Sequence, residues 1–317
     1  MKHQILLYYK YVHVDDPTSL MNSQRALCQK LGLKGRIIVA NEGINGTVEG
    51  TIENTEKYIE EMNKDLRFVD IHWKKSVGTG SAFKKLSVKV RNEIVSLHLE
   101  EKDFNPNDIT GKRLSPEELD KWFRENKDFV IVDMRNDYEL EVGKFDRTVF
   151  PGMKNFRDLR KQVESIKNLK DKTVLTVCTG GVRCEKASGF LVEEGFKDVY
   201  QLDGGIVSYM EKYPAKDFKG TLYVFDERIT MDFDDPDKHV VIGKCKLCKT
   251  PCERYVNCAN NGCHLHFVCC DGCSDESGKS YCSEKCKREV KMRETVEFVR
   301  GLWSIAFSSK NKQFRKR

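Results

Sequence analysis

The stretch that decides the fold of the middle of the chain reads Thr173-Val174-Leu175-Thr176-Val177-Cys178-Thr179-Gly180-Gly181-Val182-Arg183-Cys184. Its first five residues are β-branched or apolar and predict a buried strand, and residues 185–194 have a helical pattern. The cysteine therefore lies between a strand and the first turn of a helix, where unpaired backbone N–H groups and the helix dipole favour a thiolate. The paired glycines let the loop curl so that several N–H groups point inward, and Arg183 adds a fixed positive charge. We expect Cys178 to be a reactive thiol rather than a structural cysteine.

The spacing between this cysteine and the arginine separates two chemistries. Cysteine phosphatase loops have one residue more, which leaves room for a phosphate. The tighter loop here, with four residues between Cys178 and Arg183, resembles that of rhodaneses, whose cysteine carries sulfur as a persulfide. Val130-Ile131-Val132-Asp133-Met134-Arg135 and Leu202-Asp203-Gly204-Gly205-Ile206 resemble further rhodanese elements, and we expect Asp133 and Arg135 to support the fold. The chain departs from the family at Gly143-Lys144-Phe145, where rhodaneses often have Gly-His-Ile.

Cys184 occupies a position that is commonly Ser or Thr in such loops. It would either resolve a persulfide or sulfenate on Cys178 as a disulfide, or only line the loop, and we favour the second role. The sequence thus predicts two catalytic residues, Cys178 and Arg183, and a supporting loop made of Thr179, Gly180, Gly181, Val182 and Cys184.

Strand and helix signals alternate on both sides of this loop. A capped helix begins after Ser115, with Glu118 as the reciprocal capping-box residue. Alternation of this kind predicts a parallel sheet covered on both faces, and the resemblance of the loop implies a rhodanese-like α/β domain over residues 113–236. The predicted strands are 129–132, 173–177 and 198–202, and the predicted helices are 155–169 and 185–194.

Residues 1–100 predict a smaller α/β unit. The signals follow the order β-α-β-β-α-β of a split ferredoxin-like fold, with Asn41-Glu42-Gly43-Ile44-Asn45-Gly46-Thr47 as a turn. This fold hosts many functions and decides none by itself. A linker is expected over 101–112, which contains Pro106, Asn107 and Gly111. The predicted strands are 5–14, 36–40, 47–49, 69–73 and 86–95, and the predicted helices are 15–31 and 51–65.

Ten of the 13 cysteines lie between positions 245 and 286. Eight of them form close pairs, which fit two closed tetrahedral Zn²⁺ sites in a cysteine-rich module over 240–290. A cross-braced arrangement would join the first pair with the third and the second with the fourth, and an iron–sulfur cluster is the rival interpretation. Cys252, Cys269, His264 and His266 remain unassigned. The predicted ligands are Cys245, Cys248, Cys258, Cys263, Cys270, Cys273, Cys282 and Cys286.

Composition narrows the class of protein further. With 33% charged and 39% hydrophobic residues and no apolar run of membrane-spanning length, we expect a soluble globular protein. Residues 1–9 lack the pattern of a signal peptide, so we expect a cytoplasmic location and no membrane partner. The net charge of +6 is concentrated near the end, where 287–317 carries ten Lys or Arg against three Glu. We expect a basic helix or tail over 291–317 that either contacts phosphates without specificity or only solubilises the chain.

Three motifs in fixed order resemble one family, the rhodanese-related tRNA uridine hydroxylases. They are the turn at 41–47, the loop and helix start at 178–187, and Pro251-Cys252-Glu253-Arg254-Tyr255-Val256-Asn257-Cys258-Ala259-Asn260. The resemblance covers essentially the full chain. It implies oxygen-dependent conversion of uridine at tRNA wobble position 34 to 5-hydroxyuridine, with Cys178 as the essential cysteine and the anticodon loop of tRNA as the partner. The electron donor and the oligomeric state are not indicated.

Uridine 34 lies in a single-stranded loop, where an enzyme can splay the base out, stack it on an aromatic ring and hold the flanking phosphates. Candidate phosphate contacts are basic residues interleaved with Trp73 and Phe83, together with two arginines, namely Lys74, Lys75, Lys84, Lys85, Lys89, Arg157 and Arg160.

The means of oxygen activation is not evident in the sequence, where His98-x-Glu100 has only part of the spacing of an iron triad. We hypothesise that Cys178 adds to C6 of uridine and activates C5 toward an oxidant. The alternatives are a sulfurtransferase that uses the same loop, and a binding module without catalysis.

Overall fold

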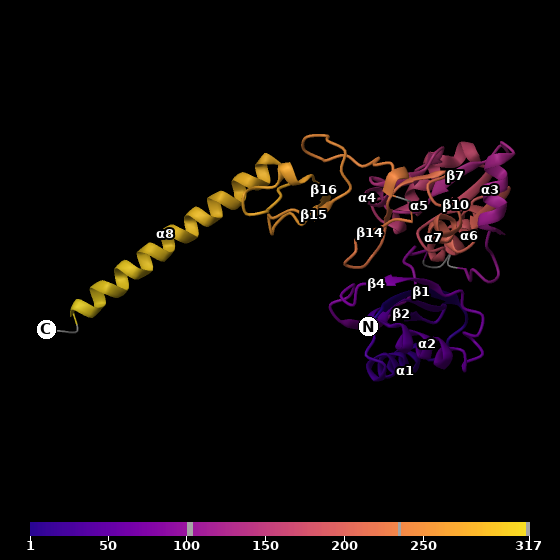
Figure 1. Ribbon diagram of the computed structural model, residues 1–317, viewed down its shortest axis with the longest axis horizontal. Coiled ribbons are helices and arrows are strands. Elements are labelled where there is room, and N and C mark those ends of the chain that lie inside the picture. The colour runs from indigo at the N-terminus through magenta and orange to yellow at the C-terminus, as the bar shows by residue number, and fades with distance from the viewer. Residues whose placement is uncertain (100–103, 234–235, 315–317) are drawn as a thin grey trace. The chain divides into compact units, whose positions relative to one another are not determined.

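A computed structural model describes residues 1–99, 104–233 and 236–314, which form two units, Met1–Val240 and Val241–Arg317 (Figure 1). Residues 101–103 of the predicted linker, Glu100 of the partial iron motif and the last three residues of the predicted tail lie outside the described residues. Among the described helices, none has the length and apolar character needed to span a membrane. The boundaries proposed above for the individual domains remain predictions.

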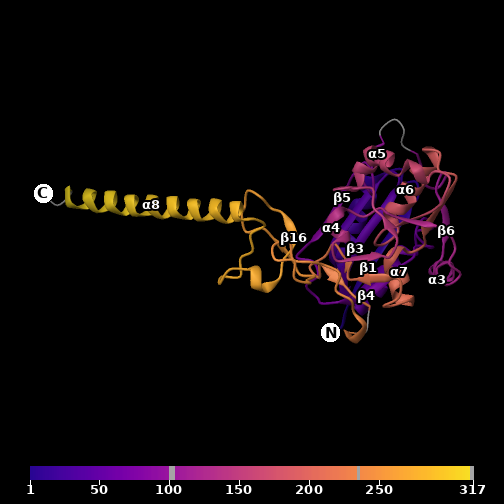
Figure 2. The same ribbon diagram turned by 90° about the horizontal axis from the view of Figure 1, so that it is seen from above.

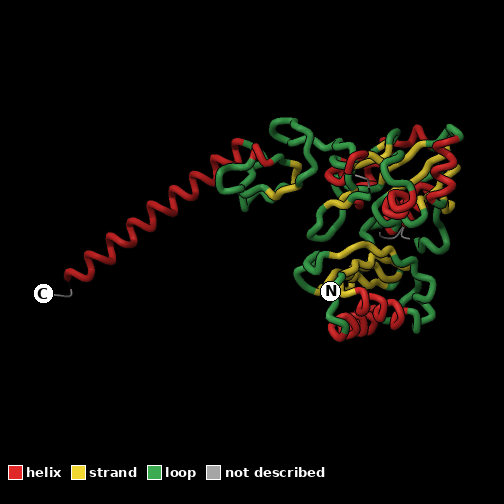
Figure 3. The backbone as a smooth tube through the Cα atoms, viewed as in Figure 1, coloured by secondary structure: helices red, strands yellow, loops and turns green. Residues whose placement is uncertain are grey.

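The N-terminal domain is built on a five-stranded sheet with the order β4-β1-β3-β2-β5. Neighbouring strands are antiparallel except β2 and β5, which are parallel. Both helices cover the same face of this sheet (Figure 3), so the predicted ferredoxin-like order is confirmed, with β5 added at the edge of β2. The elements are β1 (His3–Tyr11), α1 (Pro17–Lys30), β2 (Lys34–Ala40), β3 (Gly43–Thr51), α2 (Ile52–Met62), β4 (Lys74–Gly78) and β5 (Leu86–Val90).

One predicted strand of this domain is wrong. Residues 69–73 do not form a strand, and β4 begins only at Lys74. The apolar residues that suggested a strand pack beneath the sheet from the turn that follows α2: Phe68 and Ile71 are buried, and Trp73 lies 4.6 Å from the Tyr8 ring, centroid to centroid. An edge strand with a polar sequence, Lys-Lys-Ser-Val-Gly, gives a weak pattern signal.

The central domain has a sheet of five strands in the order β6-β11-β10-β7-β9, and every neighbouring pair is parallel. This confirms the predicted parallel α/β fold, with helices on both of its faces (Figure 2). The capping box at Ser115 and Glu118 is also present. The elements are β6 (Lys112–Leu114), α3 (Pro116–Arg124), β7 (Val130–Asp133), α4 (Asp137–Leu140), β8 (Gly143–Phe145), β9 (Thr148–Val149), β10 (Thr173–Val177), α6 (Val182–Glu193), β11 (Asp198–Leu202), α7 (Gly205–Lys212), β12 (Phe218–Gly220), β13 (Leu222–Tyr223) and β14 (Thr230–Met231).

The helix predicted over 155–169 is broken into three pieces. A single turn of α-helix, α5 (Leu159–Gln162), lies between two 3₁₀ segments, Phe156–Asp158 and Val163–Leu169. The buried residues Phe156, Leu159, Val163, Ile166 and Leu169 recur mostly every third position, which fits the three-residue turn of a 3₁₀ helix better than the α-helical repeat.

The second unit has little regular structure besides one long helix. A two-stranded ribbon, β15 (Tyr255–Asn257) and β16 (His266–Val268), precedes α8 (Glu284–Phe314). Its small core consists largely of sulfur, since Cys245, Cys258, Cys269 and Cys286 are buried around Phe267. A core of this composition is typical of small units that a bound metal ion stabilises.

Candidate active site

The cysteine loop joins β10 to α6 and is held in shape by the start of α7. The Ile206 N–H donates to the Cys178 carbonyl over 2.9 Å, and the Val207 N–H donates to the Thr179 carbonyl over 3.0 Å. Gly205, with a φ of +71°, lies so close that a Cβ atom there would stand 2.6 Å from the Gly181 nitrogen. The predicted Gly-Gly element is therefore the surface against which the loop folds.

Cys178 lies at the centre of this loop. Its sulfur accepts a hydrogen bond from the Gly181 N–H over 3.2 Å. Burial raises the pKa of this thiol, but a hydrogen bond from the Cys184 thiol, the charge of Arg183 and two backbone N–H groups oppose burial and bring the pKa down to about 6. A thiol with this pKa is largely thiolate at neutral pH, and thiolate is the nucleophilic form.

Arg183 is fixed by a carboxylate that sequence reasoning missed. Its guanidinium makes a bidentate ion pair with Glu139 of α4, with N···O distances of 2.6 and 2.9 Å, and donates to Thr179 Oγ1 over 3.2 Å. Burial works against the charge of Arg183, and Glu139 outweighs it, so the pKa of Arg183 is raised and the side chain stays cationic. The only sequence signal at Glu139 was its spacing from Asn136, which is typical of a helix start and says nothing about Arg183.

The Cys184 thiol contacts the Cys178 sulfur from inside the domain. It is fully buried and contributes to the apolar cluster of the domain, but it does not line the cavity in front of Cys178. Burial and the neighbouring Cys178 raise its pKa well above the ordinary value, so it remains a thiol and donates a hydrogen bond. The alternative role, resolving an oxidised Cys178 as a disulfide, remains open. Asp133 and Arg135 form a separate, fully buried ion pair of 2.7 Å beneath the loop, the place of fold-supporting residues.

A cavity of about 420 Å³ opens in front of Cys178, and both domains line it. The central domain contributes the cysteine loop together with Phe156 and Phe225, and the N-terminal domain contributes strands β1 to β4 and Phe83. Its wall is mainly apolar and aromatic, with basic residues at Arg36, Lys74, Lys75, Arg157, Arg183 and Arg228. A cavity of this kind suits a flat aromatic or heterocyclic ring whose attached groups carry negative charge.

Strand β1 of the N-terminal domain packs directly on the cysteine loop. A Cβ atom on Gly180 would come within 2.8 Å of Leu7 Cδ2, and one on Gly181 would come within 3.0 Å of Tyr9 Oη. The two loop glycines therefore serve a second purpose that the sequence did not reveal, because they let the other domain approach the loop.

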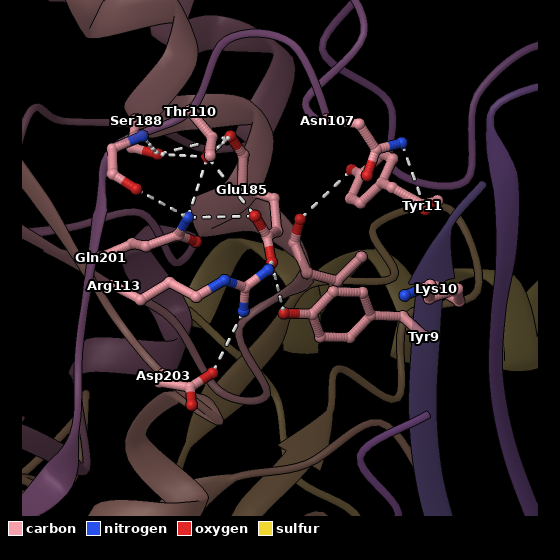
Figure 4. A network of polar contacts seen from close by, with 12 residues as sticks. Tyr9, Lys10, Tyr11, Asn107, Thr110, Arg113, Glu185, Ser188, Gln201 and Asp203 are labelled. Carbon is pink, nitrogen blue, oxygen red and sulfur yellow. Dashed lines mark hydrogen bonds and ion pairs between the residues drawn. The ribbon is translucent and has the colours of Figure 1, made fainter. Parts of the chain in front are cut away.

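The helix that follows the loop is bound to both domains through Glu185 (Figure 4). This buried carboxylate accepts hydrogen bonds from Tyr9 Oη at 3.1 Å, from Arg113 at 2.6 Å and from Gln201 at 3.0 Å. Arg113 also pairs with Asp203 at 3.2 Å. The network ties the first turn of α6 to β1 of the N-terminal domain and to the neighbouring strands β6 and β11.

The next residue, Lys186, makes a second connection. Its buried ammonium lies 2.9 Å from a Glu42 oxygen and 2.7 Å from a Glu93 oxygen, both in the N-terminal half. Burial lowers the pKa of Lys186, but the two carboxylates outweigh burial and raise it. Glu42 belongs to the motif at 41–47, so this part of the motif has a structural role at the domain interface.

The predicted nucleic-acid contacts fall into two groups. Lys75, Lys84, Lys85, Lys89, Arg157 and Arg160 are exposed, whereas Lys74 is only 5% exposed and faces the cavity. Among the exposed residues, Lys75 is paired with Glu56 at 2.7 and 2.8 Å, Lys84 lies 3.7 Å from Glu227, and Arg160 donates to the His98 carbonyl. Of the aromatic residues expected beside them, Trp73 packs in the core and Phe83 lines the cavity.

The eight paired cysteines gather in two groups, each with its ligand atoms within 4.8 Å of one another. The first pair joins the third and the second joins the fourth, which is the cross-braced alternative. Individual sulfur separations are 3.4 Å for Cys248 and Cys270 and 3.5 Å for Cys263 and Cys282. Four thiolates about 2.3 Å from one ion stand about 3.8 Å apart, so both groups fit closed tetrahedral zinc sites. The groups are Cys245, Cys248, Cys270 and Cys273, and Cys258, Cys263, Cys282 and Cys286.

The unassigned residues lie outside these two groups. Cys269 is buried in the core of the unit, and Cys252 accepts a hydrogen bond from the Arg254 N–H over 3.4 Å. His266 is hydrogen-bonded to Asn257 at 2.9 Å and stacks on Tyr255, while His264 has a φ of +54° in the turn after Cys263. Each group already contains four thiols, so neither histidine is needed as a ligand.

Comparisons with known proteins agree with this architecture. Residues 3–94 match the UPF0176 acylphosphatase like domain, residues 115–212 match the Rhodanese-like domain and residues 219–287 match the domain described as Rhodanase C-terminal. A tRNA uridine(34) hydroxylase of Bacillus licheniformis is 45% identical over 292 residues, 90% of this chain and 88% of its own. One of Staphylococcus epidermidis strain ATCC 35984 is 46% identical over 299 residues, 92% of this chain and 91% of its own. Since the similarity extends through all three domains, this chain belongs to the tRNA uridine(34) hydroxylase family.

Proposed function

We propose that this protein is an oxidoreductase that converts uridine 34 in the anticodon loop of tRNA to 5-hydroxyuridine, with molecular oxygen as the co-substrate. The observation that carries the proposal is the Cys178 thiolate at the base of a cavity lined by both domains of a chain in this family. We expect the enzyme to act in the cytoplasm, where its substrate is.

The cavity suits a single flipped base. Uridine 34 is already unpaired in the anticodon loop, so moving it out of the stack costs little. Phe83, Phe156 and Phe225 offer apolar faces for the pyrimidine ring. Arg36 and Arg157, both exposed and lining the same cavity, are placed to hold flanking phosphates.

The thiolate makes a direct route to C5 available. Cys178 sulfur forms a bond to C6, the C5–C6 π electrons move toward C4 and O4, and the resulting enolate makes C5 nucleophilic. Oxygen is then transferred to C5, the C5 proton leaves, and loss of the thiolate restores the ring. One atom of O₂ ends in the product and the other in water, which requires two electrons and two protons from a reductant.

The second unit is assigned a structural part in this function. Its two groups of four thiolates would each hold one Zn²⁺, which supplies folding energy and leaves no ligand position for chemistry. We propose that this unit, with the basic residues of α8, helps to dock tRNA.

The central test is nucleoside mass spectrometry of tRNA treated with purified enzyme, with and without oxygen. Wild type is expected to form 5-hydroxyuridine only with oxygen, and Cys178→Ser is expected to lose at least about 10³-fold in rate, as other nucleophile deletions do. Cys28→Ala is the matched control, because it removes a buried thiol in the core of the N-terminal domain, outside the cavity lining. Normal hydroxylation by Cys178→Ser contradicts the proposed role of the thiol. Sulfur transfer from thiosulfate without any 5-hydroxyuridine establishes the sulfurtransferase alternative instead.

The tRNA-binding surface has its own test. Lys84 and Lys85 are exposed and directly follow Phe83, which lines the cavity. The double change Lys84→Glu and Lys85→Glu should weaken tRNA binding and flatten its salt dependence, because each phosphate contact contributes about 0.7–0.9 to the slope. Lys57→Glu with Lys64→Glu, on and just after α2, is the matched control. Equal tRNA affinities for the two double variants would remove the Lys84 and Lys85 patch from the site.

A further inference from the structure

Lys74 is a buried lysine without an ion-pair partner. Its side chain lies on β4, only 5% of the residue is exposed, and among the described residues no carboxylate oxygen comes within 4.0 Å of its ammonium. The neighbouring Lys75 behaves in the ordinary way, since it is exposed and paired with Glu56 at 2.7 Å. Adjacent residues of one strand point to opposite faces, so Lys74 is buried and Lys75 is exposed, although both line the cavity.

The ammonium of Lys74 shares the cavity with Cys178. It lies 5.1 Å from the centroid of the Tyr9 ring, and that ring is itself held by the bond from Tyr9 Oη to Glu185. An aromatic ring holds a cation in position over its face but does not neutralise its charge. Burial lowers the pKa of Lys74 to about 8, with the more distant Asp203 and the Cys178 thiolate acting in the opposite direction. The side chain is thus mostly charged at neutral pH.

Keeping an unpaired charge buried is costly unless a partner of opposite charge arrives during function. Phosphates of a bound RNA are the first candidates, yet the base is the part that must reach Cys178, and exposed arginines line the same cavity for the backbone. The anion that arises inside the cavity is the enolate formed when the thiolate adds to the ring.

We propose that Lys74 is a catalytic residue that binds the anionic uracil oxygen formed when Cys178 adds to C6 of the bound base. This inference rests on the proposed function. In the step, the S–C6 bond forms, the C5–C6 π pair moves to the C4–O4 group, and the negative charge of the thiolate passes to O4, where the ammonium of Lys74 donates a hydrogen bond. Protonation at C5, loss of the original C5 proton and elimination of the thiolate return unchanged uridine whose C5 hydrogen has been exchanged with solvent. This return path requires no oxidant.

The test compares Lys74→Met with Lys57→Met, which removes the same charge from an exposed position on α2, outside the cavity lining. Three quantities are measured on full-length enzyme: the rate of 5-hydroxyuridine formation, the dissociation constant for tRNA, and C5 exchange at uridine 34 in D₂O without oxygen. Removing one donor to a developing oxyanion costs about 10²–10³ in rate. Lys74→Met is expected to lose both rates by that factor and to bind tRNA within about twofold of wild type, whereas Lys57→Met should keep both rates.

Several results would overturn the proposal. Weaker tRNA binding and a smaller salt slope with an unchanged maximal rate would make Lys74 a phosphate contact. A Lys74→Met enzyme that hydroxylates at the wild-type rate would leave Lys74 no part in the chemistry. Thermal unfolding shows whether Lys74→Met is folded, and if it is not, Lys74→Arg takes its place. Lys74→Arg keeps the positive charge but changes the position of the donor. Loss of both rates with unchanged tRNA affinity in this variant supports the proposal. No 5-hydroxyuridine from wild type would defeat the proposed function itself, which is a separate outcome.

Discussion

The chain holds thiolates in two opposite ways. In the central domain a single sulfur, Cys178, is balanced by backbone N–H groups and by the charge of Arg183, and open space lies before it. In the second unit, two groups of four sulfurs are crowded within 4.8 Å, an arrangement that only a cation can make favourable. The same side chain is therefore suited to reaction where its charge is offset by fixed dipoles, and to a structural role where its charge would be shared with a metal ion.

Metal removal is expected to give the largest difference in stability between the second unit and the rest of the chain. Structural zinc contributes about 10–16 kcal/mol to small domains, so a strong chelator should unfold the second unit while residues 1–240 keep their secondary structure. Circular dichroism and metal analysis would measure both effects. Cys263→Ser should lower the zinc content from two equivalents to one, whereas Cys252→Ser, outside the two groups, should retain both. Full zinc content in Cys263→Ser would contradict the predicted ligand set.

Removing the counterion of Arg183 is expected to have the next largest effect. Glu139→Gln leaves the guanidinium buried without its bidentate partner, which costs about 3–5 kcal/mol of stability in comparable buried pairs. Denaturant unfolding would measure the loss. Glu53→Gln, which breaks an exposed pair with Lys57, is the control and should leave stability nearly unchanged, because water screens an exposed pair. Equal losses for both variants would show that Glu139 has no special place in the site.

The pH dependence of alkylation distinguishes the two kinds of cysteine directly. Because the pKa of Cys178 is lowered to about 6, its reaction with iodoacetamide should rise through pH 6 and level off by pH 7, whereas an ordinary thiol is still gaining reactivity toward pH 9. The zinc-bound cysteines should stay unlabelled until the metal is removed. Peptide mass spectrometry across a pH series gives both readings, and a midpoint above pH 8 at Cys178 would contradict the electrostatic account of the loop.

The smallest expected effect concerns Cys184. Its thiol donates to the Cys178 sulfur, so Cys184→Ala should raise the midpoint of Cys178 alkylation by about one pH unit, in keeping with the loss of one hydrogen bond to a charged group. Cys28→Ala should leave the midpoint unchanged. An unaltered midpoint in Cys184→Ala would mean that the backbone and Arg183 stabilise the thiolate by themselves.

Local patterns predicted much of this structure. Three features depend only on neighbours in sequence and can be predicted without knowledge of the fold. They are the strand that leads to Cys178, the capping box at Ser115 and the eight clustered cysteines. The misplaced strand at 69–73 shows the limit of this approach, because apolar residues in a turn and in a strand look alike until the sheet edge is known.

The features that failed to show in the sequence are contacts between distant segments. Glu139 forms an ion pair with Arg183, 44 positions away in sequence, and Tyr9 donates a hydrogen bond to Glu185, 176 positions away. Lys74 looked like one member of a basic surface run, and only the approach of the two domains buries it and separates it from Lys75. Charge patterns along a chain do not distinguish a solvated lysine from one enclosed at an interface.

The ion pairs of Lys186 limit which substitutions this enzyme can accept during evolution. At the interface between the two halves of residues 1–240, the ammonium of Lys186 is shared by Glu42 and Glu93. Replacing one of these three charges alone would leave a buried charge without its partner, so their substitutions are coupled. The lysine stands two turns of helix or less from the reactive loop. A transplanted rhodanese-like domain that lacks this lysine would bring the Cys178 loop without its tie to the N-terminal domain, which contributes the other wall of the cavity.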